Sequence, residues 1–370
     1  MSAKGTIPAV IGDAAGRDDA GREEKLLHPE TALPEDARDY ALRPARLEEF
    51  LGQATMKENL AIFIAAAKER GECLDHLFLT GPPGLGKTTM ARIVANEMGV
   101  DFTETSAPAL EKAKDLVGIL TSLKPNAVFF IDEIHRLRPE IEEKLYIAME
   151  DYELDFVIGQ GPGARTMRLP LKPFTLAGAT TKAGMVSSPL ISRFGISCRF
   201  SLYESADIEA IIRRSAALLG VSIDDDAAAL LSTSSRFTPR VTNRLLRRMR
   251  DYAQVQKLPS ITFEVVRSGL KRLEIDELGL ERLDREILRM IIERYGGGPV
   301  GAETLAISVG ESVDTLEDFY EPYMIQAGLL QRTPRGRMVT APAYKHLNLE
   351  RPAGQGESLP GAHVSGGLFS

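Results

Sequence analysis

Cysteines and long apolar runs are scarce in this 370-residue sequence, and each shortage excludes a class of protein. Cys73 and Cys198 are too few for a disulfide framework and lack the spacing of metal ligands. No apolar run approaches the roughly 18 residues that a membrane-spanning helix needs. The stretch IPAVIG near the N-terminus is too short for the apolar centre of a secretory signal. We therefore expect a cytoplasmic protein.

Positive charge is also in short supply, because the formal net charge is −7. A chain of this kind does not coat nucleic acids with its whole surface, so any contact with them must be local. The segment GLLQRTPRGRMVTAP is the exception, since Arg332, Arg335 and Arg337 surround a Pro-Arg-Gly turn with apolar residues on both sides. This pattern predicts a small hairpin that carries its arginines at the tip.

The length predicts two or three domains. HLFLTG, AVFFIDE and FTLAGATT have the composition of buried strands, and TTMARIVANEMG has helical spacing that ends on a glycine. Strands that alternate with helices predict an α/β domain with a parallel sheet. We expect this large domain to span residues 31–203.

The rest of the chain divides by its pattern. A helical pattern predicts a small domain over residues 204–275, and helices followed by the arginine hairpin predict a winged-helix domain over residues 276–350. Residues 1–30 show no sustained periodicity, so we expect a mobile arm there. Residues 351–370 are rich in Gly, Ser and Pro and predict a disordered tail.

The stretch GPPGLGKTT fits the phosphate-loop pattern, and it lies between an apolar strand and an amphipathic helix as that motif requires. Glycines allow backbone N–H groups to wrap around phosphates, and the following helix adds the positive end of its dipole. We expect Lys87 to reach the β- and γ-phosphates and Thr88 to ligate Mg²⁺. The alternative is an ordinary glycine-rich turn that opens a helix.

Two further strand ends supply polar groups. AVFFIDEIH ends in Asp132, which we expect to hold the metal through water, and Glu133, which we expect to act as general base for the attacking water. FTLAGATT ends in Thr180 and Thr181, where a hydroxyl is placed to sense the γ-phosphate. Together with the phosphate loop, these residues predict an ATPase rather than a kinase.

Two arginines complete the predicted site. Arg193, in SSPLISRFGI, follows the last strand that the pattern predicts, and we expect it to face the next subunit and stabilise transition-state charge in trans. Its alternative is a solvated loop arginine. Arg240 follows Pro239, which suits the first position of a helix. Arg240, Arg244 and Arg247 share one helical face, and we assign a site role to Arg240 alone.

In this order, the motifs resemble the RuvB family of AAA+ ATPases. The likeness runs from about Pro34 to about Leu349 and includes GPPGLGKTT, FIDEIHRL, AMEDY, SPLISRFG, TPRVTNRLLRR and QRTPRGRM. It implies an α/β AAA+ phosphate-loop domain with a parallel sheet, a small helical lid domain and a C-terminal winged-helix domain. It also implies a homohexameric ring that hydrolyses ATP to ADP and translocates duplex DNA at four-way Holliday junctions, in recombination, DNA repair and the SOS response.

The resemblance also implies roles for matching residues. The nucleotide contacts would be Leu42, Arg43, Gly84, Lys87, Thr88, Thr89, Glu150, Asp151, Tyr152, Arg193, Tyr203 and Arg240. The catalytic group would be Lys87, Asp132, Glu133, Thr180 and Arg193, with Thr88 and Asp132 at the metal. The DNA contacts would be Arg332 and Arg337, and we add Arg335 because it lies between them.

Two protein partners follow from the same resemblance. The stretch LDFVIGQGPGARTMRLPL alternates around a Gly-Pro-Gly turn and predicts a hairpin. This hairpin, around Gly161–Gly163, sits where the family binds the junction-recognising protein RuvA. The family also works with the resolvase RuvC.

The sequence departs from the family at three places and leaves other classes open. Ile191 stands where the family has a second arginine, Phe237 replaces a glycine and Lys182 replaces an arginine. The first alternative is an AAA+ clamp loader or replication initiator, which would switch rather than translocate. A protein unfoldase is disfavoured because APALEKAKDLVGILTSLKP lacks an aromatic residue for a pore loop. A DNA-binding regulator with a degenerate nucleotide fold is disfavoured by intact Lys87, Asp132 and Glu133.

Overall fold

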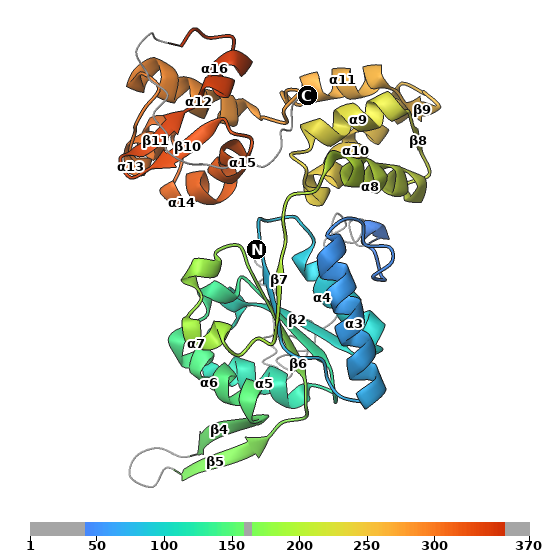
Figure 1. Cartoon of the computed structure of the whole chain (residues 1–370), viewed down its shortest axis with the longest axis vertical. Coiled ribbons are helices and arrows are strands. Elements are labelled where there is room, and N and C mark those ends of the chain that lie inside the picture. The colour runs from blue at the N-terminus through green and yellow to red at the C-terminus, as the bar shows by residue number, and fades with distance from the viewer. Residues whose placement is uncertain (1–40, 159–164, 352–370) are drawn as a thin grey trace, which may run out of the picture.

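The computed structural model describes residues 41–158 and 165–351. These residues form a large α/β domain, a helical lid and a winged-helix domain, with the last two side by side above the first (Figure 1). No helix in the described ranges is both long and apolar enough to cross a bilayer. The turn around Gly161–Gly163, the N-terminal arm and the C-terminal tail lie outside the described residues.

A five-stranded parallel sheet forms the centre of the large domain, in the order β2-β3-β6-β1-β7. The three central strands are continuous apolar runs because helices cover both of their faces. The five strands are β1 (Leu77–Thr80), β2 (Phe102–Ser106), β3 (Val128–Asp132), β6 (Thr175–Thr180) and β7 (Ile196–Arg199).

Helices pack on both faces of this sheet and divide its apolar side chains into two cores (Figure 1). One face carries α3 (Ala54–Arg70) and α4 (Lys87–Met98). The other carries α5 (Ala113–Ser122), α6 (Pro139–Glu150) and α7 (Ser188–Ile191). The antiparallel pair β4 (Glu153–Ile158) and β5 (Arg165–Pro170) projects from the far end of the domain, as the hairpin pattern predicts.

The lid packs helices against each other, and its apolar residues join the core on the α3–α4 side of the sheet. Its longest helix begins at Pro239, the position that the sequence predicts for the start of a helix. The elements are α8 (Ser205–Leu218), β8 (Ser222–Ile223), α9 (Asp225–Ser234), α10 (Pro239–Val255), β9 (Ser260–Ile261) and α11 (Phe263–Arg272).

The winged-helix domain has its own core and carries the predicted arginine hairpin before its last helix. The hairpin pairs Arg332 opposite Arg337 in an antiparallel register. The elements are α12 (Arg282–Tyr295), α13 (Ala302–Val309), α14 (Val313–Thr315), the π-helix η7 (Leu316–Tyr320), α15 (Glu321–Gln326), β10 (Leu330–Thr333), β11 (Gly336–Val339) and α16 (Ala341–His346).

The sequence pattern predicts β1, β3 and β6 but not β2 or β7. These two are the edge strands of the sheet. The residues of β2 are half-buried or exposed, and those of β7 alternate between buried and exposed, so neither is a continuous apolar run. Because β7 follows Arg193, that arginine lies before the last strand and not beyond it.

Gly178 in β6 is a point where the packing leaves no room. A Cβ atom there would lie 2.6 Å from Ile134 Cδ1 and 2.9 Å from Phe194 Cζ. We expect Gly178→Ala to lower the free energy of unfolding by about 1–3 kcal/mol, because both neighbours must move within a packed core.

Gly118 in α5 provides the matched control, since a Cβ atom there meets nothing within 4 Å. Alanine is the better helix former, so we expect Gly118→Ala to raise the free energy of unfolding by about 0.5–1 kcal/mol. Urea unfolding of both variants measures the difference, and equal effects would contradict the packing argument.

Candidate functional site

The phosphate loop connects the end of β1 to the start of α4. Gly81, Gly84 and Gly86 have φ values of 140°, 79° and 100°, a region that residues with a side chain rarely adopt. A Cβ atom on Gly81 would also lie 2.5 Å from the carbonyl oxygen of Phe200. The glycines therefore permit the tight loop that points backbone N–H groups at a phosphate.

Lys87 is folded back into this loop. Its Nζ donates hydrogen bonds to the carbonyl oxygens of Gly81 at 2.8 Å and Pro82 at 2.9 Å, and the residue is buried. Burial lowers the pKa of Lys87, while the nearby carboxylates of Asp132 and Glu133 act in the opposite direction. The ammonium group is thus held inside the loop, where phosphate oxygens are better partners than the two carbonyls.

One cavity brings most of the predicted nucleotide residues together. It lies between the phosphate loop, the chain before α3 and the lid, and the tip of β3 closes one side of it. Of the predicted residues, it is lined by Leu42, Arg43, Gly84, Lys87, Thr88, Thr89, Asp132, Glu133, Tyr203 and Arg240. The lid is fastened to the loop by two hydrogen bonds, from Tyr203 Oη to the Leu85 carbonyl at 3.0 Å and from Arg240 N to the Gly84 carbonyl at 3.3 Å.

The donors in this cavity fit a Mg²⁺ ion that is bound with a nucleotide. The Thr88 hydroxyl and the Asp132 carboxylate line the same cavity. Within the described ranges, no cluster of three or more His, Cys, Asp or Glu residues is arranged to hold a metal alone. Mg²⁺ usually takes one or two protein ligands and completes its shell with waters and phosphate oxygens, so this donor set agrees with it.

Thr180 does not line the cavity, whereas Thr181 does. Thr180 is fully buried, and its Oγ1 lies 2.9 Å from His135 Nδ1. His135 Nδ1 in turn lies 3.3 Å from Glu133 Oε2. Thr180 is therefore connected through His135 to Glu133, the residue predicted to be the general base.

His135 belongs to the quoted FIDEIH motif, but its role was missed by the sequence analysis. The signal was its position two residues after Glu133 in a turn of 3₁₀ helix, η4 (Ile134–Arg136). Burial lowers the pKa of His135, so the ring is neutral near pH 7 and uses its lone pair or its proton to orient its neighbours.

Three lid residues that line the cavity also had no site role predicted from the sequence. Arg214 donates to the carbonyl oxygen of Leu42 at 2.8 Å and so closes the segment before α3 onto the lid. Ser215 Oγ and Asn243 Oδ1 are buried without a hydrogen-bond partner among the described residues, and both residues line the cavity. They are therefore available to a ligand. Asn243 belongs to the quoted stretch TPRVTNRLLRR, whereas Arg214 and Ser215 belong to no quoted motif, because α8 brings them to the cavity from a separate part of the chain.

Four of the predicted nucleotide contacts, Glu150, Asp151, Tyr152 and Arg193, do not line the cavity. Arg193 forms an ion pair of 3.2 Å with Glu150, next to Asp151 and Tyr152 in sequence. The Tyr152 hydroxyl lies 3.3 Å from Cys73 Sγ, and its ring packs edge-on against Phe174. If these residues contact nucleotide, the nucleotide belongs to another subunit, which agrees with the action in trans expected of Arg193.

The wing arginines are held by carboxylates. Arg332 Nε donates to the fully buried Glu321 at 2.6 Å, and Arg337 Nε donates to the same carboxylate at 2.9 Å. Glu317 also pairs with Arg337. The Arg337 side chain is 12% exposed, against 46% for Arg332, and Arg335 is exposed at the turn. The three arginines of the predicted hairpin therefore differ in their exposure to solvent.

The structure shows where the three residues that depart from the family pattern lie. Lys182 Nζ lies 2.8 Å from Asp318 Oδ2, so it links the end of β6 to the winged-helix domain. Ile191 is partly exposed at the end of α7. Phe237 has a φ of 50°, a left-handed conformation that glycine adopts without cost, and Arg236 before it has a φ of 56°.

We expect His135→Ala to reduce ATP turnover about 10²-fold, because the general base loses the group that orients it. Nucleotide affinity should hold, since the ring is not among the residues that line the cavity. His135→Asn should recover part of the loss, because its amide reaches the position of Nδ1. Steady-state turnover and equilibrium nucleotide binding measure the two effects, and a parallel loss of binding would contradict this role.

Sequence models of the RuvB family match the chain in three consecutive segments. The Holliday junction DNA helicase RuvB P-loop domain matches residues 42–200, the RuvB AAA lid domain residues 203–276 and the RuvB C-terminal winged helix domain residues 277–348. These segments follow the three structural units described above.

Individual proteins agree with these matches. The Holliday junction branch migration complex subunit RuvB of Treponema denticola is 68% identical over 317 residues, which cover 86% of this chain and 92% of the relative. The protein of the same name from Paramagnetospirillum magneticum is 54% identical over 328 residues, covering 89% and 94%. The structure of the Thermotoga maritima RuvB Holliday junction branch migration motor superposes with a TM-score of 0.77 at 49% identity, covering 84% of this chain and 100% of that one. The chain belongs to the RuvB family of Holliday junction branch migration ATPases.

Proposed function

We propose that this chain is an ATP-driven motor that moves duplex DNA through Holliday junctions as a homohexamer. The single observation that supports this most is the division of the ATPase groups. The phosphate loop, Asp132, Glu133 and Arg240 share one cavity, while Arg193 lies outside it. A subunit built in this way needs a neighbour to complete its site, which favours a ring. Family membership disfavours the clamp-loader, unfoldase and regulator alternatives.

In the proposed reaction, backbone N–H groups of the loop and Lys87 hold the phosphates, and the Thr88 hydroxyl and Asp132 carboxylate hold Mg²⁺. The metal ion, when bound, neutralises charge on the phosphate oxygens. Glu133, oriented by His135, accepts the proton of the attacking water. Arg193 of one subunit donates to the developing charge at the site of the next.

The partner surfaces are proposed from position. The β4–β5 hairpin projects from the large domain away from the lid and the winged-helix domain, so it is open to RuvA (Figure 1). Met167 on this hairpin is 47% exposed, which gives a docking partner an apolar contact. RuvC, the resolvase, would act at the same junction.

The function is tested by migration of a synthetic four-way junction with purified chain, ATP, Mg²⁺ and RuvA. We expect migration that needs ATP and that RuvA stimulates, with the Glu133→Gln protein inactive. Junction binding without ATP-dependent migration would instead favour a switch of the clamp-loader type.

We expect Arg193→Ala to lower ATP turnover by about 10³-fold or more, the effect of comparable arginine fingers, without loss of nucleotide binding. Glu133→Gln should have a similar effect because its base is lost. A mixture of the two variants should recover activity, since an intact Glu133 can then meet an intact Arg193 at mixed interfaces. If every mixing ratio stays inactive, Arg193 does not act in trans.

The wing should bind DNA through backbone phosphates, because a motor must move along any sequence. We expect Arg332→Ala and Arg335→Ala to weaken binding equally for unrelated duplexes and to flatten the slope of log affinity against log salt by about 0.9 for each lost contact. Arg332→Ala and Arg337→Ala should each also lower thermal stability, because each takes one of two partners from the buried Glu321, whereas Arg335→Ala should not.

Arg267→Ala is the control for net charge, since Arg267 is an exposed lid residue paired with Glu264. Fluorescence anisotropy over a range of salt concentrations measures all four variants. An unchanged slope in the Arg332→Ala, Arg335→Ala double variant would mean that the wing does not grip DNA.

A further inference from the structure

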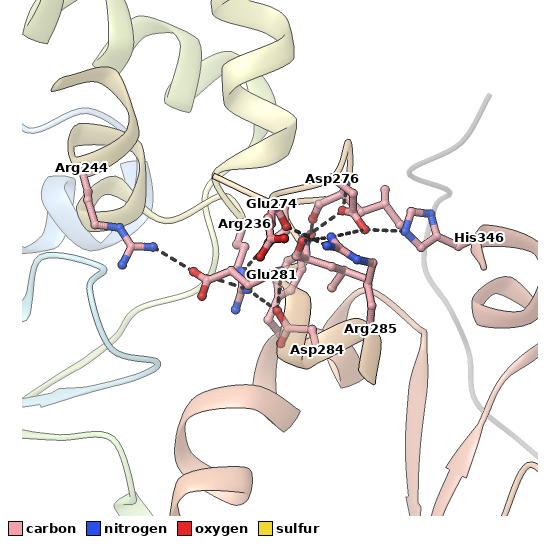
Figure 2. A network of polar contacts seen from close by, with 12 residues as sticks. Arg236, Arg244, Glu274, Asp276, Glu281, Asp284, Arg285 and His346 are labelled. Atoms are coloured by element: carbon pink, nitrogen blue, oxygen red, sulfur yellow. Dashed lines mark hydrogen bonds and ion pairs between the residues drawn. The ribbon is translucent and has the colours of Figure 1, made fainter. Parts of the chain in front are cut away.

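A buried ion pair joins the lid to the winged-helix domain (Figure 2). Arg236, in the loop between α9 and α10, donates from Nη2 to Asp284 Oδ2 at 2.5 Å and from Nε to the Gly279 carbonyl at 2.8 Å. Asp284 is fully buried in α12 and also accepts from Glu281 N at 2.7 Å. Arg236 is itself 8% exposed. The pair therefore connects the two domains by directional bonds that solvent does not weaken.

The linker between the domains is held on both sides of this pair. Asp276 accepts from His346 Nε2 at 2.8 Å and from the backbone N–H of Leu280 at 2.8 Å. Arg285 donates to the carbonyl oxygens of Leu280 at 2.6 Å and Glu274 at 2.8 Å. Figure 2 shows Asp276, Arg285 and His346 gathered around this connection. These bonds hold the linker against the winged-helix domain. Arg236 of the lid binds to this fixed part of the chain.

The other end of the same loop touches the phosphate loop. A Cβ atom on Gly84 would lie 2.8 Å from Thr238 Cγ2 and 3.0 Å from Arg240 Cβ, so the two loops are in close contact. Arg240 lines the nucleotide cavity and its N–H donates to the Gly84 carbonyl. A nucleotide that enters the cavity therefore meets a segment whose first residue, Arg236, holds the winged-helix domain.

This segment is short and constrained. Arg236 and Phe237 both have left-handed backbone conformations, and Pro239 fixes a third φ angle. Thr238 Oγ1 donates to the Arg236 carbonyl at 2.9 Å. The backbone of residues 236–240 is therefore constrained at three of its five positions and by a hydrogen bond within the segment.

From Arg236, contacts continue to the DNA-binding wing. The Arg236 guanidinium lies 5.2 Å from the ring centroid of Tyr323 in α15. The same short helix begins at Glu321, the carboxylate that holds Arg332 and Arg337. One helix thus contacts Arg236 with one residue and orients the wing arginines with another.

We propose that Arg236 is a positioning residue that couples the nucleotide cavity to the DNA-binding wing, through its bonds to Asp284 and Gly279 and its contact with Tyr323. The proposal rests on the motor function proposed above. Spatial continuity alone does not establish coupling, so the test must measure coupling separately from binding and hydrolysis.

The charge on Asp284 makes the contact between the lid and the winged-helix domain specific for one arrangement. Burial raises the pKa of Asp284 to about 6, and the positive charge of Arg236 opposes that rise. Asp284 Oδ1 has no hydrogen-bond partner within the described ranges. A buried pair of this kind adds little stability compared with apolar side chains, and its known use is to select one arrangement.

The test uses the full-length hexamer with Asp284→Asn, which keeps the shape and removes the charge. ATP turnover and KM without DNA should be unchanged, and so should duplex affinity without nucleotide. The stimulation of turnover by DNA and the base pairs migrated per ATP should each fall about tenfold, as expected for a typical coupling between two sites. Arg236→Met should have the same effect, and the double variant should lose no more than either single one.

Arg244→Ala is the matched control, because the Arg244–Glu281 ion pair of 3.0 Å crosses the same boundary on the exposed surface. It should leave coupling intact. If Asp284→Asn does not fold, Arg236→Met with Asp284→Leu replaces the pair by apolar side chains, and we expect it to fold and to be uncoupled. Normal migration per ATP in the folded variants would overturn the proposal. Failure of the wild-type chain to migrate junctions would instead overturn the proposed function.

Discussion

Parallel pairing of the strands is the constraint on which the site depends. β1 pairs with β6 and β7, and β3 pairs with β6, all in the same direction. Their carboxyl ends therefore meet at one edge of the sheet, and the chain that leaves each strand begins there. This brings the phosphate loop, Asp132 and the Thr180–Thr181 pair together although β3 and β6 are far apart in sequence. Without this register, the motifs would be separate loops.

The lid forms the side of the nucleotide cavity that the edge of the sheet leaves open. The large domain supplies the groups for phosphate and metal, whereas Tyr203, Arg214 and Arg240 close the cavity from the lid side. The apolar residues of the two units form one continuous core beside the cavity. Arg236 lies in the loop just before α10 and Arg240 lies in the first turn of that helix, so the cavity and the winged-helix domain contact opposite ends of one short segment.

Positive charge is also gathered in one part of the molecule, the wing. The chain is acidic overall, yet Arg332, Arg335 and Arg337 lie within six residues of one another in the wing. Arg332 and Arg337 are paired with Glu317 and the buried Glu321. Glu321 accepts from the Nε atoms of both Arg332 and Arg337, so these two side chains are already oriented for the DNA contact proposed above. Preorganisation of this kind reduces the entropy lost on binding.

The short-range sequence pattern alone was enough to predict the central strands, the phosphate loop, the helix that begins at Pro239 and the arginine hairpin. Each of these features is determined by residues that are close in sequence. The determinants are apolar runs, glycine conformations and fixed turn residues. The edge strands escaped the pattern because half-exposed strands carry polar residues. The roles of Leu42 and Tyr203 were predicted from family resemblance alone, whereas that of Arg193 was predicted also from its place after a predicted strand.

Tertiary structure decided which polar groups meet. It placed His135 between Thr180 and Glu133, Ser215 and Asn243 in the cavity, and Asp284 against Arg236. It also turned Arg193 away from its own cavity and half-covered the wing arginines. The physical reason is the same throughout: a hydrogen bond or ion pair depends on a few ångströms between side chains that are distant in sequence, and only the packing of whole domains sets those distances.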